Sequence, residues 1–198
     1  FGKNTKDRYD GEIAFADHHV GKLIDHSQTL ASHESTAFVV LSDHGEAFGE
    51  HRFHFHGHTL FEEEIRVPLI ITGPGVQPGV SKGRVELVDI VPTISAWLEI
   101  DHLLPPGLPG RSLMNALEGR ELEPRRIFAQ LLPYPNWPEE QHVLIVDDMK
   151  VLYHRSRNIW MLYDLKNDPA EKKNIAQKHS RFPELKKRLR EMLQTTTQ

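Results

Sequence analysis

The sequence predicts an α/β fold, and three observations indicate it. Two short apolar runs, at residues 37–41 and 67–72, are bounded by turn residues and have the length of buried strands. Helical periodicity lies on both sides of them, at residues 7–30 and 86–98. Later in the chain, several short strand-like runs follow one another. The predicted order is therefore a mixed or parallel sheet with flanking helices, then a small antiparallel sheet and a C-terminal helix.

Both predicted helices of the first part have one apolar stripe, with members spaced three and four residues apart. The stripe of residues 7–30 consists of Tyr9, Ile13, Ala16, Val20 and either Leu23 or Ile24. The stripe of residues 86–98 consists of Leu87, Ile90, Val91, Ile94 and Leu98. Each stripe can cover one face of a sheet.

The run at residues 37–41 is apolar at almost every position. Continuous apolar runs are typical of parallel strands that are buried on both faces, so we expect a strand of that kind. Residues 67–72 predict a second buried strand, with Pro68 at its start because proline cannot donate a hydrogen bond to the ladder. Residues 45–60 are too polar for a core element and predict a loop on the active face.

The C-terminal part has a different pattern. The predicted strands are residues 126–132, 142–147, 149–154 and 159–164. Asp147 and Asp148 predict a two-residue hairpin turn, and residues 182–193 predict an amphipathic helix. We therefore divide the chain into a larger α/β part, residues 1–120, and a small α+β part, residues 121–198.

Composition excludes several classes of site. The chain has 198 residues, of which 38% are hydrophobic, so it can build a core. A net charge of -4 gives no indication of a nucleic-acid partner. No cysteine is present, which excludes disulfides, thiolate metal sites and a cysteine nucleophile within this chain. No apolar stretch approaches the roughly 20 residues of a membrane-spanning helix.

Asp43 and His44 directly follow the predicted strand at residues 37–41 and so lie at its carboxyl end. Ligands bind at that edge in open α/β sheets. A carboxylate and an imidazole are common ligands of divalent metal ions, and Gly45 allows a sharp turn beside them. The alternative is a pair of solvated loop residues. We favour metal ligation by Asp43 and His44, because their position and their ligand type agree.

The histidines are concentrated in the same region. Five of the thirteen fall within fifteen residues: His44, His51, His54, His56 and His58. Histidine is a common metal ligand and the usual acid or base near neutral pH. For His51 and His54 we favour ordinary solvated positions in a loop. For His56 and His58 we predict a catalytic role.

Other residues are weaker candidates. Glu46 could orient a ligating histidine, although solvated loop acids are commoner. Asp17 is more simply a carboxylate on a helix surface. Tyr134 and Trp137 lie in a proline-rich loop and are candidates for the wall of a substrate pocket.

Several segments, taken in order, resemble the sulfatase family of the alkaline-phosphatase-like superfamily. They are Arg8-Tyr9-Asp10-Gly11-Glu12-Ile13, Ser42-Asp43-His44-Gly45-Glu46, His56-Gly57-His58-Thr59-Leu60-Phe61-Glu62-Glu63, Ile65-Arg66-Val67-Pro68-Leu69-Ile70-Ile71, Gly73-Pro74-Gly75, Leu87-Val88-Asp89-Ile90-Val91-Pro92 and Leu162-Tyr163-Asp164-Leu165 with Asp168-Pro169, Glu171 and Asn174. The resemblance covers nearly the whole chain. It is specific to the superfamily and much less so to a substrate.

The resemblance implies an alkaline-phosphatase-like sheet and one divalent metal ion, held by Asp43 and His44 together with aspartates outside this chain. The family's usual metal is Ca²⁺, and relatives use Mn²⁺, Zn²⁺ or Mg²⁺. The resemblance also implies a nucleophile, a formylglycine made from the first residue of a Cys/Ser-x-Pro-x-Arg motif, which attacks a sulfate or phosphate ester. His56 or His58 occupies the stretch that helps to protonate the leaving alcohol.

The chain departs from the family pattern because it contains no Cys/Ser-x-Pro-x-Arg motif. We therefore interpret it as the C-terminal fragment of a sulfuric-ester hydrolase, with half of the metal site and no activity of its own. One alternative is a phosphoryl-transferring relative, such as a phosphonate monoester hydrolase or a phosphoethanolamine transferase. Another is a non-catalytic module with the same fold.

Partners and location follow from the same interpretation. The expected partner is a sulfate-ester or phosphate-ester substrate, with no nucleic acid and no membrane segment in this chain. A fragment that exposes the edge of a sheet is also expected to self-associate through that edge. The sequence does not indicate the compartment. Many members of the family that the chain resembles are exported or membrane-tethered, which favours a periplasmic or extracytoplasmic location.

Overall fold

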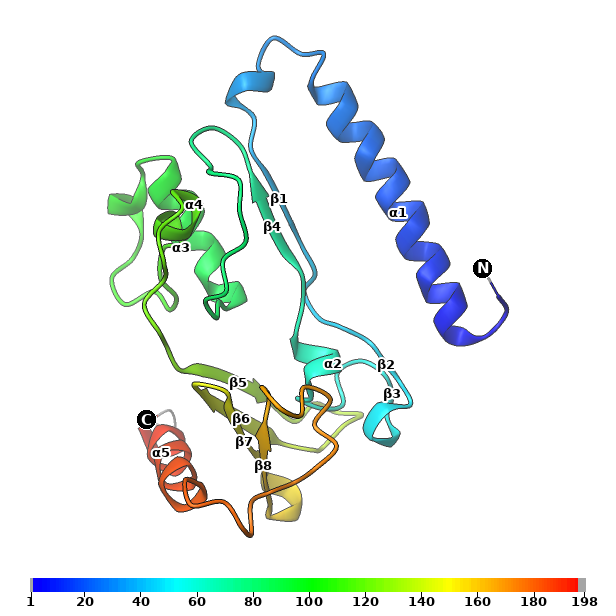
Figure 1. Cartoon of the computed structure of the whole chain (residues 1–198), viewed down its shortest axis with the longest axis vertical. Coiled ribbons are helices and arrows are strands. Elements are labelled where there is room, and N and C mark those ends of the chain that lie inside the picture. Colours follow the sequence, from blue (N-terminus) through cyan, green and yellow to red (C-terminus); the bar gives the residue numbers. More distant parts are fainter. Residues whose placement is uncertain (1, 196–198) are drawn as a thin grey trace.

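The computed structural model describes residues 2–195 and is shown in Figure 1. Its α-helices are α1 (Thr5–Ser27), α2 (Glu62–Ile65), α3 (Ile90–Trp97), α4 (Met114–Leu117) and α5 (Phe182–Thr195). Its strands are β1 (Phe38–Leu41), β2 (Ala47–Phe48), β3 (His54–Phe55), β4 (Leu69–Thr72), β5 (Ile127–Leu131), β6 (Gln141–Val146), β7 (Met149–His154) and β8 (Ile159–Asp164). The mixed α/β class and the order of the elements are as predicted from the sequence.

Strands β1 and β4 form a two-stranded antiparallel pair, with Phe38 opposite Thr72 and Leu41 opposite Leu69. The prediction of a buried parallel strand at residues 37–41 is therefore wrong for the described part of the chain. An apolar run indicates a strand but carries no information on the direction of its neighbour. The pair is also only partly covered, since Leu41 is 39% exposed and Ile70 is 60% exposed.

Helix α1 stands to one side of the β1–β4 pair, and α3 and α4 lie on the other (Figure 1). Asn4 caps α1 by accepting a hydrogen bond from the backbone N–H of Asp7 at 2.8 Å. None of the α1 residues, all of which the structure describes, is buried. The apolar stripe is formed but packs only at Tyr9, whose ring meets that of Phe48 edge-on at a centroid distance of 5.2 Å, and residues such as Leu23 are exposed to solvent. Self-association through an exposed sheet edge stays a prediction.

The C-terminal part is a four-stranded antiparallel meander in the order β5-β6-β7-β8, as predicted. Asp147 and Asp148 make the two-residue turn between β6 and β7, since Val146 pairs with Met149. Asp147 has φ +55°, a backbone conformation that turn residues of this type adopt. The division of the chain near residue 120 stays a prediction.

Both faces of this meander are covered by other parts of the chain. One of these contacts fixes the position of residues 45–60, which we call the histidine-bearing segment. One face packs against α5 through a cluster of Leu144, Val146, Met149, Val151, Leu162, Ala176, Leu185 and Leu189. The other face packs against residues that follow the loop, in a cluster of Leu60, Phe61, Val143, Ile145, Leu152, Tyr163 and Leu165. Each fully buried leucine contributes roughly 2 kcal/mol relative to an exposed one. The sheet thus anchors the C-terminal end of the histidine-bearing segment.

The segment at residues 45–60 is more ordered than a simple loop. Strands β2 and β3 pair antiparallel within it, with Ala47 opposite Phe55. Ala47, Thr59 and Leu60 are buried. The polarity of the segment correctly indicated that most of it lies outside the core, but gave no sign that these three residues are buried. Separately, none of the described helices has the length and apolar character needed to cross a membrane.

Acid is expected to destabilise the end of the meander that carries His154 and Glu139. Burial lowers the pKa of His154 below its ordinary value of 6.5, and the hydrogen bond from Arg157 lowers the pKa of Glu139 below 4.5. At these two groups the unfolded chain therefore binds protons before the folded one, so the stability they contribute is lost as the pH falls below 6.5 and again below 4.5. We expect the thermal unfolding midpoint to fall between about pH 7 and about pH 4, as measured by calorimetry.

A His154→Gln variant tests the upper part of this range, because it removes the titrating group and leaves Glu139 in place. It should lose part of the decline just below pH 6.5. His18→Gln, at an exposed position on α1, should keep the full decline. An unfolding midpoint that stays constant across the range would contradict the assignment.

Candidate metal centre

Asp43 and His44 follow the carboxyl end of β1, as predicted. The Asp43 side chain is 87% exposed and that of His44 is 45% exposed. Asp43 Oδ1 accepts a hydrogen bond from the His44 backbone N–H at 3.1 Å and lies 3.8 Å from His44 Nε2. The two side chains therefore offer an oxygen and a nitrogen donor on the same side of the turn.

A backbone contact determines which nitrogen of His44 is available. His44 Nδ1 lies 2.8 Å from the carbonyl oxygen of Gly45, which can only accept, so Nδ1 carries the hydrogen. In the neutral imidazole the lone pair is then on Nε2, the nitrogen nearer Asp43. Metal-binding histidines are commonly oriented by such a contact through their other ring nitrogen.

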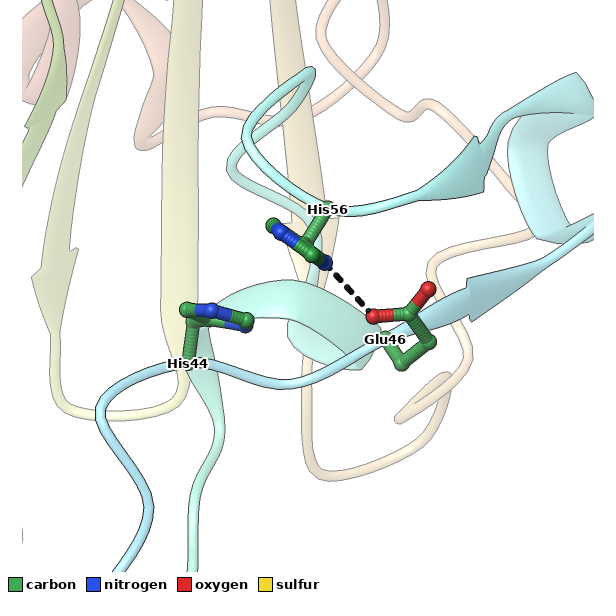
Figure 2. A group of neighbouring side chains, drawn as sticks. All are labelled: His44, Glu46 and His56. Atoms are coloured by element: carbon green, nitrogen blue, oxygen red, sulfur yellow. Dashed lines mark hydrogen bonds and ion pairs between the residues drawn. The ribbon is translucent and has the colours of Figure 1, made fainter. Parts of the chain in front are cut away.

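Glu46 and His56 gather beside His44, and Figure 2 shows these three side chains; Asp43 is not a member of this group. His56 Nδ1 lies 2.8 Å from Glu46 Oε2, and the rings of His44 and His56 stack with their centroids 4.1 Å apart. One donor atom from each of His44, Glu46 and His56 lies within 4.8 Å of the others. The turn after β1 and the stretch after β3 thus bring together residues that are ten or more positions apart in the sequence.

His58 does not join this group, although it is close to His56 in the sequence. Its Nδ1 contacts the backbone carbonyl of His54 at 3.2 Å, and its ring lies 4.4 Å from that of Trp137. Tyr134 Oη also donates a hydrogen bond to the Gly57 carbonyl at 3.4 Å. The proline-rich loop of the C-terminal part therefore borders the histidine-bearing segment, on the side that His58 occupies.

Glu64, in α2, joins the two segments that carry the centre. Its backbone carbonyl accepts from the N–H of Gly45 at 2.8 Å. Its buried carboxylate accepts from the N–H groups of His58 and Thr59, at 3.1 and 3.3 Å. One residue therefore sets the distance between the turn after β1 and the segment that follows His56. Sequence reasoning missed this role, because a glutamate in an acidic run gives no signal of burial.

The remaining histidines of the cluster lie outside the centre. His51 Nδ1 contacts Glu63 Oε1 at 2.7 Å, and its ring stacks on Phe61 at a centroid distance of 3.6 Å. The interpretation of His51 as a solvated loop residue is wrong, because its side chain is packed against Phe61 and is only 17% exposed. Glu46 was interpreted as a solvated acid and instead contacts His56.

The donors present suit a divalent ion. Asp43 and Glu46 offer carboxylate oxygens, and His44 and His56 offer imidazole nitrogens. Mn²⁺ and Zn²⁺ accept such mixed sets, whereas Ca²⁺ takes about six to eight oxygen ligands. A Ca²⁺ ion at this place needs further oxygen donors beyond those of the described residues.

Comparisons with known sequences point to one family. Residues 3–100 match the family model described as Sulfatase. An arylsulfatase of Clostridium perfringens is 29% identical over 87% of this chain and 36% of its own length. Arylsulfatase K of Bos taurus is 32% identical over 98% of this chain and 36% of its own length. The chain thus spans a little more than a third of these curated relatives.

Solved structures show the same pattern. A protein in complex with its substrate D-glucosamine-2-N,6-O-disulfate matches 93% of this chain and 38% of its own, with TM-score 0.78 and 25% identity. The phosphonate monoester hydrolase of Silicibacter pomeroyi matches 91% of this chain and 38% of its own, with TM-score 0.76 and 26% identity. Both sulfate-ester and phosphonate chemistry therefore occur among proteins of this fold.

Proposed function

This chain belongs to the sulfatase family, and we propose that it supplies the metal-binding half of the active site of a sulfate-ester hydrolase. The observation that carries the proposal is the position of His44, Glu46 and His56, whose donor atoms lie within 4.8 Å of one another beside Asp43. These residues come from the end of β1 and from the stretch after β3.

Asp43 and His44 would hold the divalent ion, and Glu46 and His56 face the same space. We propose Ca²⁺ as the ion on family grounds, with oxygen donors from outside this chain; Mn²⁺, Zn²⁺ and Mg²⁺ are the alternatives. When bound, the ion supplies positive charge beside the ester oxygens. Because His44 Nδ1 contacts the Gly45 carbonyl, Nε2 is left free to bind the ion.

His56 is the better placed of the two predicted catalytic histidines. Because Nδ1 contacts Glu46, Nε2 is the nitrogen available to a substrate, and the carboxylate fixes the direction of the ring. His56 can therefore hold or deliver a proton at the oxygen of the leaving alcohol. We place His58 at the substrate side of the segment, beside Trp137.

The nucleophile must come from outside these 198 residues, because the chain lacks a Cys/Ser-x-Pro-x-Arg motif. We therefore expect the isolated chain to be inactive. A phosphoryl-transferring enzyme is the second candidate, since the phosphonate monoester hydrolase of Silicibacter pomeroyi is as similar to this chain as the sulfated-sugar complex. A non-catalytic module would bind no metal ion at Asp43 and His44.

The test compares two substrates and two proteins. The protein that contains this chain together with a nucleophile should hydrolyse p-nitrophenyl sulfate faster than a phenylphosphonate monoester, and the isolated chain should hydrolyse neither. Chelation with EDTA should stop the reaction, and re-addition of a divalent ion should restore it. A preference for the phosphonate ester would favour the second candidate. EDTA-resistant turnover would exclude the metal-dependent mechanism.

A further inference from the structure

Lys150 is a charged residue at a fully buried position in the middle of β7. Its side chain is on the face of the sheet that carries Ile145 and Leu152. Lys150 Nζ lies 3.0 Å from Glu62 Oε1 and 2.9 Å from Glu171 Oε1. Replacing a buried ion pair by packed apolar side chains is often neutral or stabilising. The stability of the sheet alone therefore does not account for these charges.

Glu171 extends from this buried group to the histidine-bearing segment. Its Oε2 accepts a hydrogen bond from the backbone N–H of Glu62 at 2.6 Å. Its backbone carbonyl accepts from His51 Nε2 at 3.1 Å. Glu171 has φ +50°, which is the left-handed region, and the bonds on both sides of the residue stabilise this uncommon conformation.

The contact between Glu171 and His51 links the C-terminal part to the segment that carries the candidate metal centre. His51 lies five residues after Glu46 and five residues before His56. His51 Nδ1 contacts Glu63, which precedes Glu64, the residue that joins the two segments of the centre. His51 itself has φ +48°, an uncommon backbone conformation for a residue with a side chain. The contacts of the His51 side chain hold this turn between β2 and β3 in place.

We propose that Glu171 is a positioning residue for the candidate metal centre. Glu171 and Lys150 hold Glu62, which directly follows the histidine-bearing segment. The Glu171 carbonyl holds His51, in the turn between β2 and β3. The C-terminal part would thereby fix where His56 lies relative to His44. This inference rests on the proposed metal site, but its main readout does not depend on a bound ion.

The test uses Glu171→Asn in the 198-residue chain, because asparagine tolerates the left-handed conformation but is too short to keep both carboxylate contacts. We expect amide hydrogen exchange of residues 47–59 to become about tenfold faster or more, with the amides of β6 and β7 unchanged. Mn²⁺, used as the probe ion in titration calorimetry, should bind about tenfold more weakly. His51→Asn, which leaves the buried charges in place, should also make amide hydrogen exchange of residues 47–59 faster.

Leu144→Ala is the matched control for lost stability. Leu144 is buried on the opposite face of the sheet, in the cluster with α5, and so the variant should leave exchange of residues 47–59 unchanged. Unchanged exchange in Glu171→Asn, or an equal increase in Leu144→Ala, would overturn the positioning role. If the segment is released as expected but the original chain binds no Mn²⁺, the positioning role stands and the proposed metal site fails.

Discussion

Replacing both Asp43 and His44 by alanine is expected to abolish metal-dependent ester hydrolysis in the protein that contains this chain. The two residues provide the oxygen and nitrogen donors at the end of β1, 3.8 Å apart. Under the proposed function, losing both residues removes the metal ion whose charge stabilises the developing negative oxygens, and we expect a loss on the order of a thousandfold or more in kcat/KM. Steady-state kinetics measures this loss, and calorimetry with a divalent ion measures the loss of binding.

The chain contains a matched control for this double substitution. Asp17 and His18 are also adjacent, and both are exposed on α1. Asp17→Ala with His18→Ala should leave kcat/KM within about twofold of the original value, because surface substitutions rarely change a remote site. The Asp43 and His44 side chains are exposed, so circular dichroism should report an intact fold for both variants. Turnover retained without Asp43 and His44 would remove them from the site.

Gly45→Ala is expected to damage the centre through the backbone. A Cβ atom at this position would lie 2.1 Å from the carbonyl oxygen of Glu63 and 3.3 Å from Cα of Glu64. Both neighbours are backbone atoms of α2, so neither can rotate away. The N–H of Gly45 also donates to the Glu64 carbonyl at 2.8 Å. We expect a loss of about 2 kcal/mol or more in the free energy of unfolding.

The same shift would separate His44 and Glu46 from His56, so affinity for a divalent ion should fall together with stability. Urea denaturation measures the first effect and titration calorimetry the second. Gly79→Ala is the control, since its Cβ would meet no atom within 4 Å. That variant should stay within about 0.5 kcal/mol of the original chain. If Gly45→Ala matches it in both measurements, close packing at this turn is not what orders the site.

Local sequence patterns predicted most of the elements correctly. Short runs of strand-forming residues located the strands of the C-terminal meander, and Asp147 and Asp148 marked its turn. These features depend on neighbours in the chain, which a sequence displays directly. The direction of β1 relative to β4 depends on a partner about thirty residues away, and the prediction of a parallel strand was wrong there.

The candidate site was predictable in part for the same reason. Asp43 and His44 could be placed at a strand end, because strand and turn are adjacent in the sequence. The role of Glu46 beside His56 depends on how the segment between them folds back, and Glu46 looked like an ordinary solvated acid. His56 and His58 looked equivalent, yet only His56 points toward His44.

By itself, the sequence determined the α/β class, the position of the strand end and the chemical type of the donors, since each is encoded within a few consecutive residues. Tertiary structure alone decided which histidine meets His44, and that Lys150 and Glu171 are buried together beneath the segment. The physical reason is that burial and donor distances arise when remote segments pack on the two faces of one sheet. A lysine inside an apolar strand shows an irregular pattern in the sequence, but its partners appear only after folding.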